Sequence, residues 1–103
     1  MRKIELKKVE ETVLINNKQI KTEISYSDLL KVAINAPAQG GYSVSEMSQR
    51  LKLFDAVDQA EKNNDGKVAF EDSDFEALKK LVKDTKWSVV SRSVVDFVNE
   101  FDK

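Results

Sequence analysis

The stretch that decides the fold is VLINNKQIKTEI, residues 13–24. On both sides of its centre, apolar or β-branched residues recur at every second position, which is the period of two that β-strands show; they are Val13, Ile15, Ile20, Thr22 and Ile24. Asparagine tolerates positive φ better than other non-glycine residues, so the central Asn16-Asn17-Lys18 predicts a tight hairpin turn. The two middle residues of the turn are either Asn16-Asn17 or Asn17-Lys18, and the choice shifts the register of the hairpin.

Strand signals extend upstream of this stretch and helix signals follow it. Ile4 and Leu6 alternate with charged residues, while Ser27 is placed to cap a helix over residues 28–35. A capping box of Ser43 and Glu46 predicts a helix that runs to about residue 61. Its apolar residues form a wide stripe, which predicts burial over much of its circumference, and they are Met47, Leu51, Leu53, Phe54, Val57 and Ala60.

Two further helices are predicted in the second half of the chain. Ser73 with Glu76 forms a second capping box, and Ser93 with Asp96 marks the start of a last helix. Residues 68–70, which precede the helix that Ser73 begins, form a candidate third strand. We therefore expect a single α+β domain over residues 1–103, in which an N-terminal β-hairpin, or a three-stranded antiparallel sheet, packs against three to four helices.

Composition excludes several classes of function. The chain has 103 residues and contains neither histidine nor cysteine. Imidazole bases, thiolate nucleophiles, disulfides and thiolate zinc sites are therefore excluded. No arrangement of carboxylates, lysines or serines points to catalysis, so we predict no enzyme activity, no catalytic residue and no cofactor. No apolar run is long enough for a signal peptide or a membrane span, so we expect a cytoplasmic protein without a membrane partner.

The charge is near zero in total but uneven along the chain. There are 17 basic and 18 acidic residues, and residues 57–78 alone carry seven acidic and two basic side chains. This acidic segment is a candidate surface for a basic partner.

A turn within the acidic segment suggests a cation site. Asn63, Asp65 and Asp72 are its candidate ligands, because hard cations bind several oxygens that converge from one loop. Residues 61–72 resemble the twelve-residue calcium loop of the EF-hand family, in which Asn63 and Asp65 match the third and fifth positions and Gly66 matches the turn glycine. Glu61 and Asp72 depart from the aspartate and glutamate at the first and last positions. The alternative is that Asn-Asp-Gly supplies a turn and that Asp72 favours the start of the following helix.

Lysines at helical spacing suggest a second site. Lys79, Lys83 and Lys86 lie on one face of the helix predicted over residues 74–86, and Arg92 follows. Such a basic stripe is a candidate nucleic-acid surface. The near-zero net charge argues against that partner, and a solvated helix face is the simpler interpretation.

In the last third of the chain, Phe70-Glu71-Asp72-Ser73-Asp74-Phe75 leads into Leu78-Lys79, and Trp87 and then Val94, Val95 and Phe97 follow. With this pattern, residues 68–101 resemble small proteins of unassigned role that bacteriophages and prophages encode. The resemblance implies a bacterial host cell and a role in phage assembly or in modulating a host protein.

The function that we expect is that of a small interaction or accessory module. The edge strand of the hairpin is placed to pair with another protein or with a second copy of the chain, as in a homo-oligomer. Cation binding and nucleic-acid binding are the two alternatives.

Overall fold

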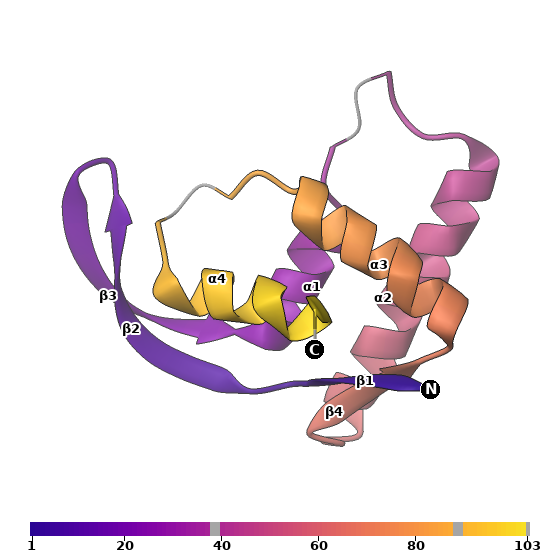
Figure 1. The fold of residues 1–103 in the computed structure, drawn as a ribbon, viewed down its shortest axis with the longest axis horizontal. Coiled ribbons are helices and arrows are strands. Elements are labelled where there is room, and N and C mark those ends of the chain that lie inside the picture. Colours follow the sequence, from indigo (N-terminus) through magenta and orange to yellow (C-terminus); the bar gives the residue numbers. More distant parts are fainter. Residues whose placement is uncertain (38–39, 88–89, 103) are drawn as a thin grey trace.

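The computed structural model describes residues 1–37, 40–87 and 90–102. Within these ranges it contains four strands, four α-helices and a final 3-10 turn (Figure 1). The α+β class and the helices packed against an N-terminal hairpin are confirmed. In chain order the elements are β1 (Arg2–Glu5), β2 (Lys8–Ile15), β3 (Lys18–Ser25), α1 (Tyr26–Ile34), α2 (Val44–Lys62), β4 (Lys67–Phe70), α3 (Asp72–Asp84), α4 (Arg92–Asn99) and η1 (Glu100–Asp102).

The hairpin consists of β2 and β3, and its turn is Asn16-Asn17. Ile15 pairs with Lys18, which leaves two residues in the turn. Both asparagines have positive φ, 51° and 65°. A two-residue turn with two positive φ angles matches the right-handed twist of the strands. The structure thus decides between the two registers that the sequence left open.

The third strand exists, but it does not join the hairpin. β4 pairs antiparallel with β1, and Ile4 faces Val68, so the described residues form two separate two-stranded sheets. The alternative of one three-stranded sheet is wrong. The chain changes sheets between two neighbouring residues, because the Leu6 amide bonds the carbonyl of Gly66 at 2.8 Å and the Lys7 carbonyl accepts from Tyr26 at 2.9 Å. Figure 1 shows β1 and β2 as one continuous curved path.

Helix α1 begins two residues earlier than predicted. Its N-cap is Ser25, whose side chain makes no cap hydrogen bond, and Ser27 lies buried inside the first turn. The physical reason is Tyr26, which is 2% exposed and meets the Phe97 ring edge-on at a centroid distance of 5.1 Å. Burial of a large aromatic ring outweighs the capping preference of one serine.

Helix α2 starts as predicted, but the helix is less buried than its sequence indicates. The Ser43 hydroxyl accepts from the Glu46 amide at 3.1 Å, as the capping box requires. Leu53, Val57 and Ala60 are the residues buried along it. Met47 and Leu51 are 45% and 61% exposed, so the wide apolar stripe is not a buried face.

Helices α3 and α4 also begin earlier than their predicted caps. Glu71 is the N-cap of α3, so Ser73 lies in the first turn instead of capping it. Ser91 caps α4, with its hydroxyl accepting from the Val94 amide at 3.2 Å. Ser93, the predicted cap, has a different partner that is described below.

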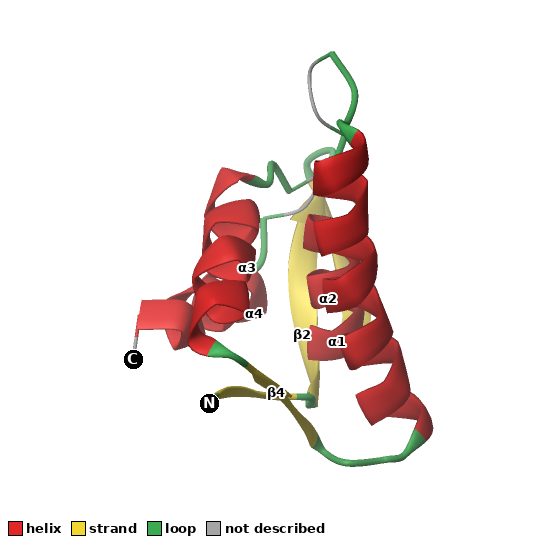
Figure 2. Cartoon of the chain, turned by 90° about the vertical axis from the view of Figure 1, so that its right-hand side faces the viewer, coloured by secondary structure: helices red, strands yellow, loops and turns green. Residues whose placement is uncertain are grey.

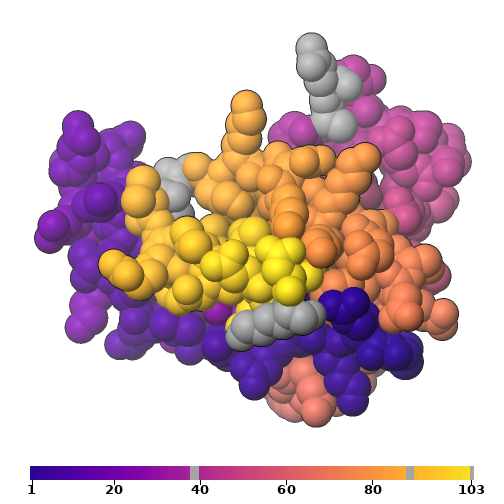
Figure 3. Space-filling model, in the orientation of Figure 1, coloured from indigo at the N-terminus to yellow at the C-terminus, as the bar shows by residue number. Residues whose placement is uncertain are grey.

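The core lies between the helices and the strands. In Figure 2, α3 and α4 lie toward one side of the view, α1 and α2 toward the other, and β2 is seen between them. Three phenylalanine rings from α3, α4 and η1 stack or meet edge-on, and Val68 and Phe70 of β4 join the same core. The hairpin projects from this core and forms the left-hand end of the molecule in Figure 3.

Candidate interaction surface

The backbone groups along β3 can be assigned to two edges from the register. In a hairpin closed by a two-residue turn, the closing pair Ile15–Lys18 exchanges hydrogen bonds, and alternate pairs do so after it. The amide and carbonyl groups of Gln19, Lys21 and Glu23 therefore point away from β2. The contacts of Leu14 agree with this alternation of inward-facing and outward-facing backbone groups. Leu14 faces Gln19, and both of its backbone groups bond Val90 across the opposite edge, at 3.1 Å each.

The outer edge of β3, residues 19–23, has no strand against it in the part of the chain that the structure describes. Sheet pairing within that part places β3 beside β2 alone. The three alternate residues 19, 21 and 23 thus present three donors and three acceptors that no strand of the described chain covers. An unpaired edge of this kind is a template for strand addition.

The side chains of this edge divide between two faces. Lys21 and Glu23 are exposed on the outer face, where Lys21 lies opposite Thr12 and Glu23 lies opposite Glu10. The inner face carries Ile20, which is 42% exposed, and the half-buried Thr22. Two like charges directly opposite each other weaken a strand pair, so Glu10 and Glu23 leave an unfavourable contact at the edge.

The carboxylate of Glu11 connects β2, the other strand of the hairpin, to the start of α4. Glu11 of β2 accepts the Ser91 hydroxyl, and its second oxygen accepts the Ser93 amide at 3.1 Å and the Ser93 hydroxyl at 2.8 Å. The hydrogen bond from Ser91 holds the pKa of Glu11 below its usual range, while burial acts in the opposite direction. The carboxylate also lies at the positive end of the helix. This contact positions the hairpin relative to the core.

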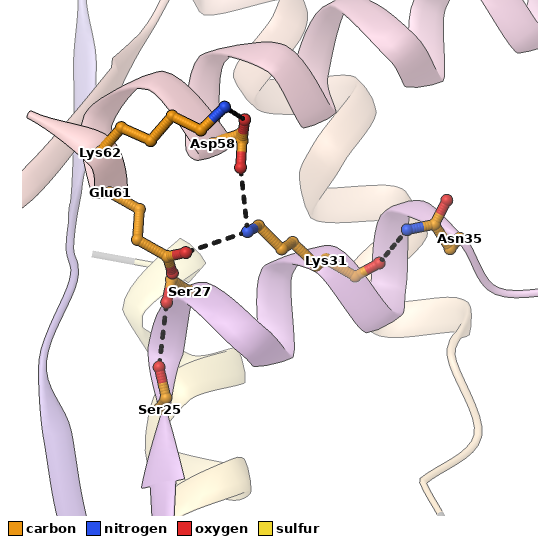
Figure 4. A network of polar contacts seen from close by, with 7 residues as sticks. All are labelled: Ser25, Ser27, Lys31, Asn35, Asp58, Glu61 and Lys62. Carbon is orange, nitrogen blue, oxygen red and sulfur yellow. Dashed lines mark hydrogen bonds and ion pairs between the residues drawn. The ribbon is translucent and has the colours of Figure 1, made fainter.

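A lysine-centred network joins α1 to α2 just after β3 ends (Figure 4). Lys31 Nζ lies 3.1 Å from Glu61 Oε1 and 3.4 Å from Asp58 Oδ1, and Lys62 Nζ lies 2.9 Å from Asp58 Oδ2. The Ser27 hydroxyl bonds Glu61 and is the main cause that lowers the pKa of Glu61. The hydrogen bond that Lys31 donates to Glu61 raises the pKa of Lys31. The network thus neutralises part of the acidic segment, residues 57–78, which the sequence analysis named as a candidate surface for a basic partner.

A cavity of about 250 Å³ opens beside this network, with Lys8, Ser25 and Glu61 in its lining. Among the described residues, no buried side-chain polar atom lacks a hydrogen-bond partner. A more apolar hollow of about 440 Å³ lies between α3 and α4 and includes Trp87, Val95 and Val98.

The candidate cation ligands are spread along the chain. Asn63 is the C-cap of α2, Asp65 follows in the turn, and Asp72 is the first residue of α3. β4 lies between Asp65 and Asp72, so these two carboxylates stand at opposite ends of a four-residue strand. No group of three acidic side chains suited to a metal ion occurs in the described ranges. The cation site stays a prediction.

The candidate nucleic-acid ligands do not form one helix face. Lys79 and Lys83 project from α3 and lie 3.3 and 2.8 Å from the carboxylate of Asp102. The hydrogen bond from Lys83 lowers the pKa of Asp102. Lys86 lies beyond the end of α3 at Asp84, and Arg92 begins α4. The predicted helix over residues 74–86 is therefore two residues too long at its end, and nucleic-acid binding stays a prediction.

Sequence reasoning did not single out Glu11 or Lys31. A signal for Glu11 was present, since it occupies the same strand face as Val9 and Val13. A carboxylate among inward-facing apolar residues requires hydrogen-bond donors. Lys31 carried no comparable signal, because its partners lie 27 and 30 residues away.

Comparison with known proteins gives no relative: no family model, no curated protein and no solved structure matches this chain. The resemblance to phage-encoded proteins stays a prediction. None of the helices in the described ranges is both long and apolar enough to cross a membrane.

Proposed function

We propose that this protein is a small non-enzymatic interaction module that binds an extended segment of a partner along the outer edge of β3. The observation that carries the proposal is the row of outward-facing backbone groups at residues 19, 21 and 23, which no strand of the described chain covers. Strand addition uses such groups for affinity and uses alternate side chains for specificity.

The anchored side of the hairpin supports this function. Glu11 and the Leu14–Val90 bridge fix β2, so β3 is presented by a strand that is already held. A partner that pairs with a preorganised edge loses less conformational freedom on binding. The side chains of Lys21 and Glu23 favour a partner with an acidic residue opposite the first and a basic residue opposite the second.

The proposal is tested with a displayed library of random peptides of about eight residues, the length of a typical added strand. We expect selected peptides to bind the wild type and to shift the amide resonances of Gln19, Lys21 and Glu23. Lys21→Pro should abolish binding, because proline removes one outward-facing donor without touching the β2–β3 ladder. Lys21→Ala is the matched control, since it removes the charge and retains the donor.

Two results would overturn the proposal. One is a selection that yields no binder, and the other is a set of binders that Lys21→Pro retains at wild-type affinity. In the second case the peptides bind elsewhere on the molecule.

A further inference from the structure

We infer that the partner of the β3 edge is a second copy of this chain, paired antiparallel about a two-fold axis through Thr22. This inference rests on the proposed function and names its partner. It is carried by the sequence of the edge itself, Ile20-Lys21-Thr22-Glu23-Ile24, which reads as a complementary pattern from its centre in both directions.

Charge selects this register among those that symmetry allows. A two-fold axis perpendicular to the sheet must lie midway between the two copies of one residue, and we name each axis by that residue. Each choice places different side chains opposite each other. An axis through Lys21 or through Glu23 puts two like charges face to face, and an axis through Ile20 puts Lys21 opposite Gln19. Only the axis through Thr22 places Lys21 of each copy opposite Glu23 of the other.

The same register completes the inner face of the sheet. Ile20 of one copy lies opposite Ile24 of the other, and the two Thr22 side chains meet on the axis. Ile20 is 42% exposed in the single chain, so a second isoleucine beside it removes apolar surface from water. Threonine pairs and aliphatic pairs across strands are both stabilising.

Pairing also offsets the unfavourable contact within one hairpin. Glu23 faces Glu10 on β2. In the dimer a lysine of the other copy lies on the opposite side of Glu23, so the carboxylate gains a neighbour of opposite sign. The backbone hydrogen bonds of the dimer come from the two Lys21–Glu23 pairs, whose amide and carbonyl groups face outward.

The arrangement closes at two copies. The outer edges of the resulting four-stranded sheet are the two β2 strands. On each of these edges the backbone of Leu14 is already hydrogen-bonded to Val90. The β3 edge pairs with its own copy about a two-fold axis, so this interface is self-complementary and closes at two copies.

The register is tested with single cysteines, because the chain has none of its own. Thr22 pairs with itself across the axis at a non-hydrogen-bonded position, where Cα atoms lie about 4.5 Å apart, within reach of a disulfide. We expect Thr22→Cys to form a disulfide-linked dimer under mild oxidation. Gln19→Cys is the matched control, since its two copies lie six residues apart along the strands, about 20 Å, and it should cross-link at least tenfold more slowly.

The charge pairing is tested by sedimentation from about 10 μM to about 1 mM, the range in which so small an interface dissociates. We expect the wild-type mass to rise with concentration from 11.7 kDa toward twice that value. Lys21→Glu and Glu23→Lys should each weaken association at least about tenfold, because both facing pairs become repulsive. A mixture of the two variants should associate again, as should the double variant. Lys80→Glu, an exposed reversal on α3, should associate like the wild type.

A wild type that stays monomeric at the highest concentration overturns the inference, as does a mixture that fails to associate or equal cross-linking of Thr22→Cys and Gln19→Cys. None of these results affects the peptide selection above. Peptides that bind the wild type and not Lys21→Pro would then retain the interaction module and replace the second copy by another protein.

Discussion

Along β2, Leu14 exchanges two backbone hydrogen bonds with Val90 and Glu11 holds the start of α4, whereas the outer edge of β3 meets no strand in the described chain. Both strands belong to one hairpin, and both have the same length. The difference arises from the C-terminal segment, which reaches one edge and leaves the other open. A strand can thus be held firmly through one side and remain available on the other.

The largest expected effect separates the inward and outward faces of β3 itself. Thr22→Pro should lower the free energy of unfolding by about 3 kcal/mol, because the Thr22 amide belongs to the ladder with β2. Lys21→Pro, one residue away, should lower it by less than about 1.5 kcal/mol, because its amide faces outward. Chemical denaturation of the two variants measures both. Equal losses of stability in the two variants would show that the outward-facing residues of β3 are assigned incorrectly.

A smaller effect is expected at the fixed edge. Glu11→Gln should lower the free energy of unfolding by about 1–2 kcal/mol at neutral pH, since an amide cannot accept the hydrogen bonds from Ser91 and Ser93 through both of its atoms. Glu10→Gln is the matched control on the same strand. It should be neutral or slightly stabilising, because it removes the like-charge contact with Glu23.

The pH dependence of this difference follows from the direction of the pKa shift. The folded-state pKa of Glu11 lies below its ordinary value of 4.5, so its stabilising effect is present above that value and is lost as the pH falls through the folded-state pKa. Wild type and Glu11→Gln should therefore converge in stability at low pH. A gap that stays constant between neutral and strongly acidic pH would contradict the contact.

The smallest effect is expected from calcium. Asp72 is separated from Asn63 and Asp65 by β4, which pairs with β1 along all four of its residues. Bringing the three side chains together would require this strand to unpair, so we expect millimolar calcium to leave the melting temperature unchanged. Asp65→Asn serves as the control. A calcium-dependent rise that Asp65→Asn abolishes would establish the cation site.

Local signals predicted the elements, and long-range contacts decided their partners. The hairpin turn and the start of α2 follow from neighbouring residues, namely the asparagine pair and the Ser43–Glu46 capping box. The partner of β4 did not follow, because Ile4 and Val68 are 64 positions apart and either sheet edge suits an alternating strand. The start of α1 was missed for a related reason, since the burial of Tyr26 depends on Phe97.

The candidate interaction surface was predictable only in part. An exposed hairpin edge follows from the strand pattern, but the sequence does not say which of its two edges is open. That required Val90, which reaches Leu14 from the far end of the chain. Once the edge and the phase are known, the complementarity of Ile20, Lys21, Glu23 and Ile24 about Thr22 can be read directly from the sequence.

The pairing of β1 with β4 predicts an order of folding. The β2–β3 hairpin joins neighbouring residues across a two-residue turn, a step that takes microseconds. β1 has to wait for Lys67–Phe70, so its closure spans most of the chain and carries a larger loop entropy. We therefore expect the β2–β3 hairpin to form before β1 pairs with β4, so that the β3 edge is present before the core is complete.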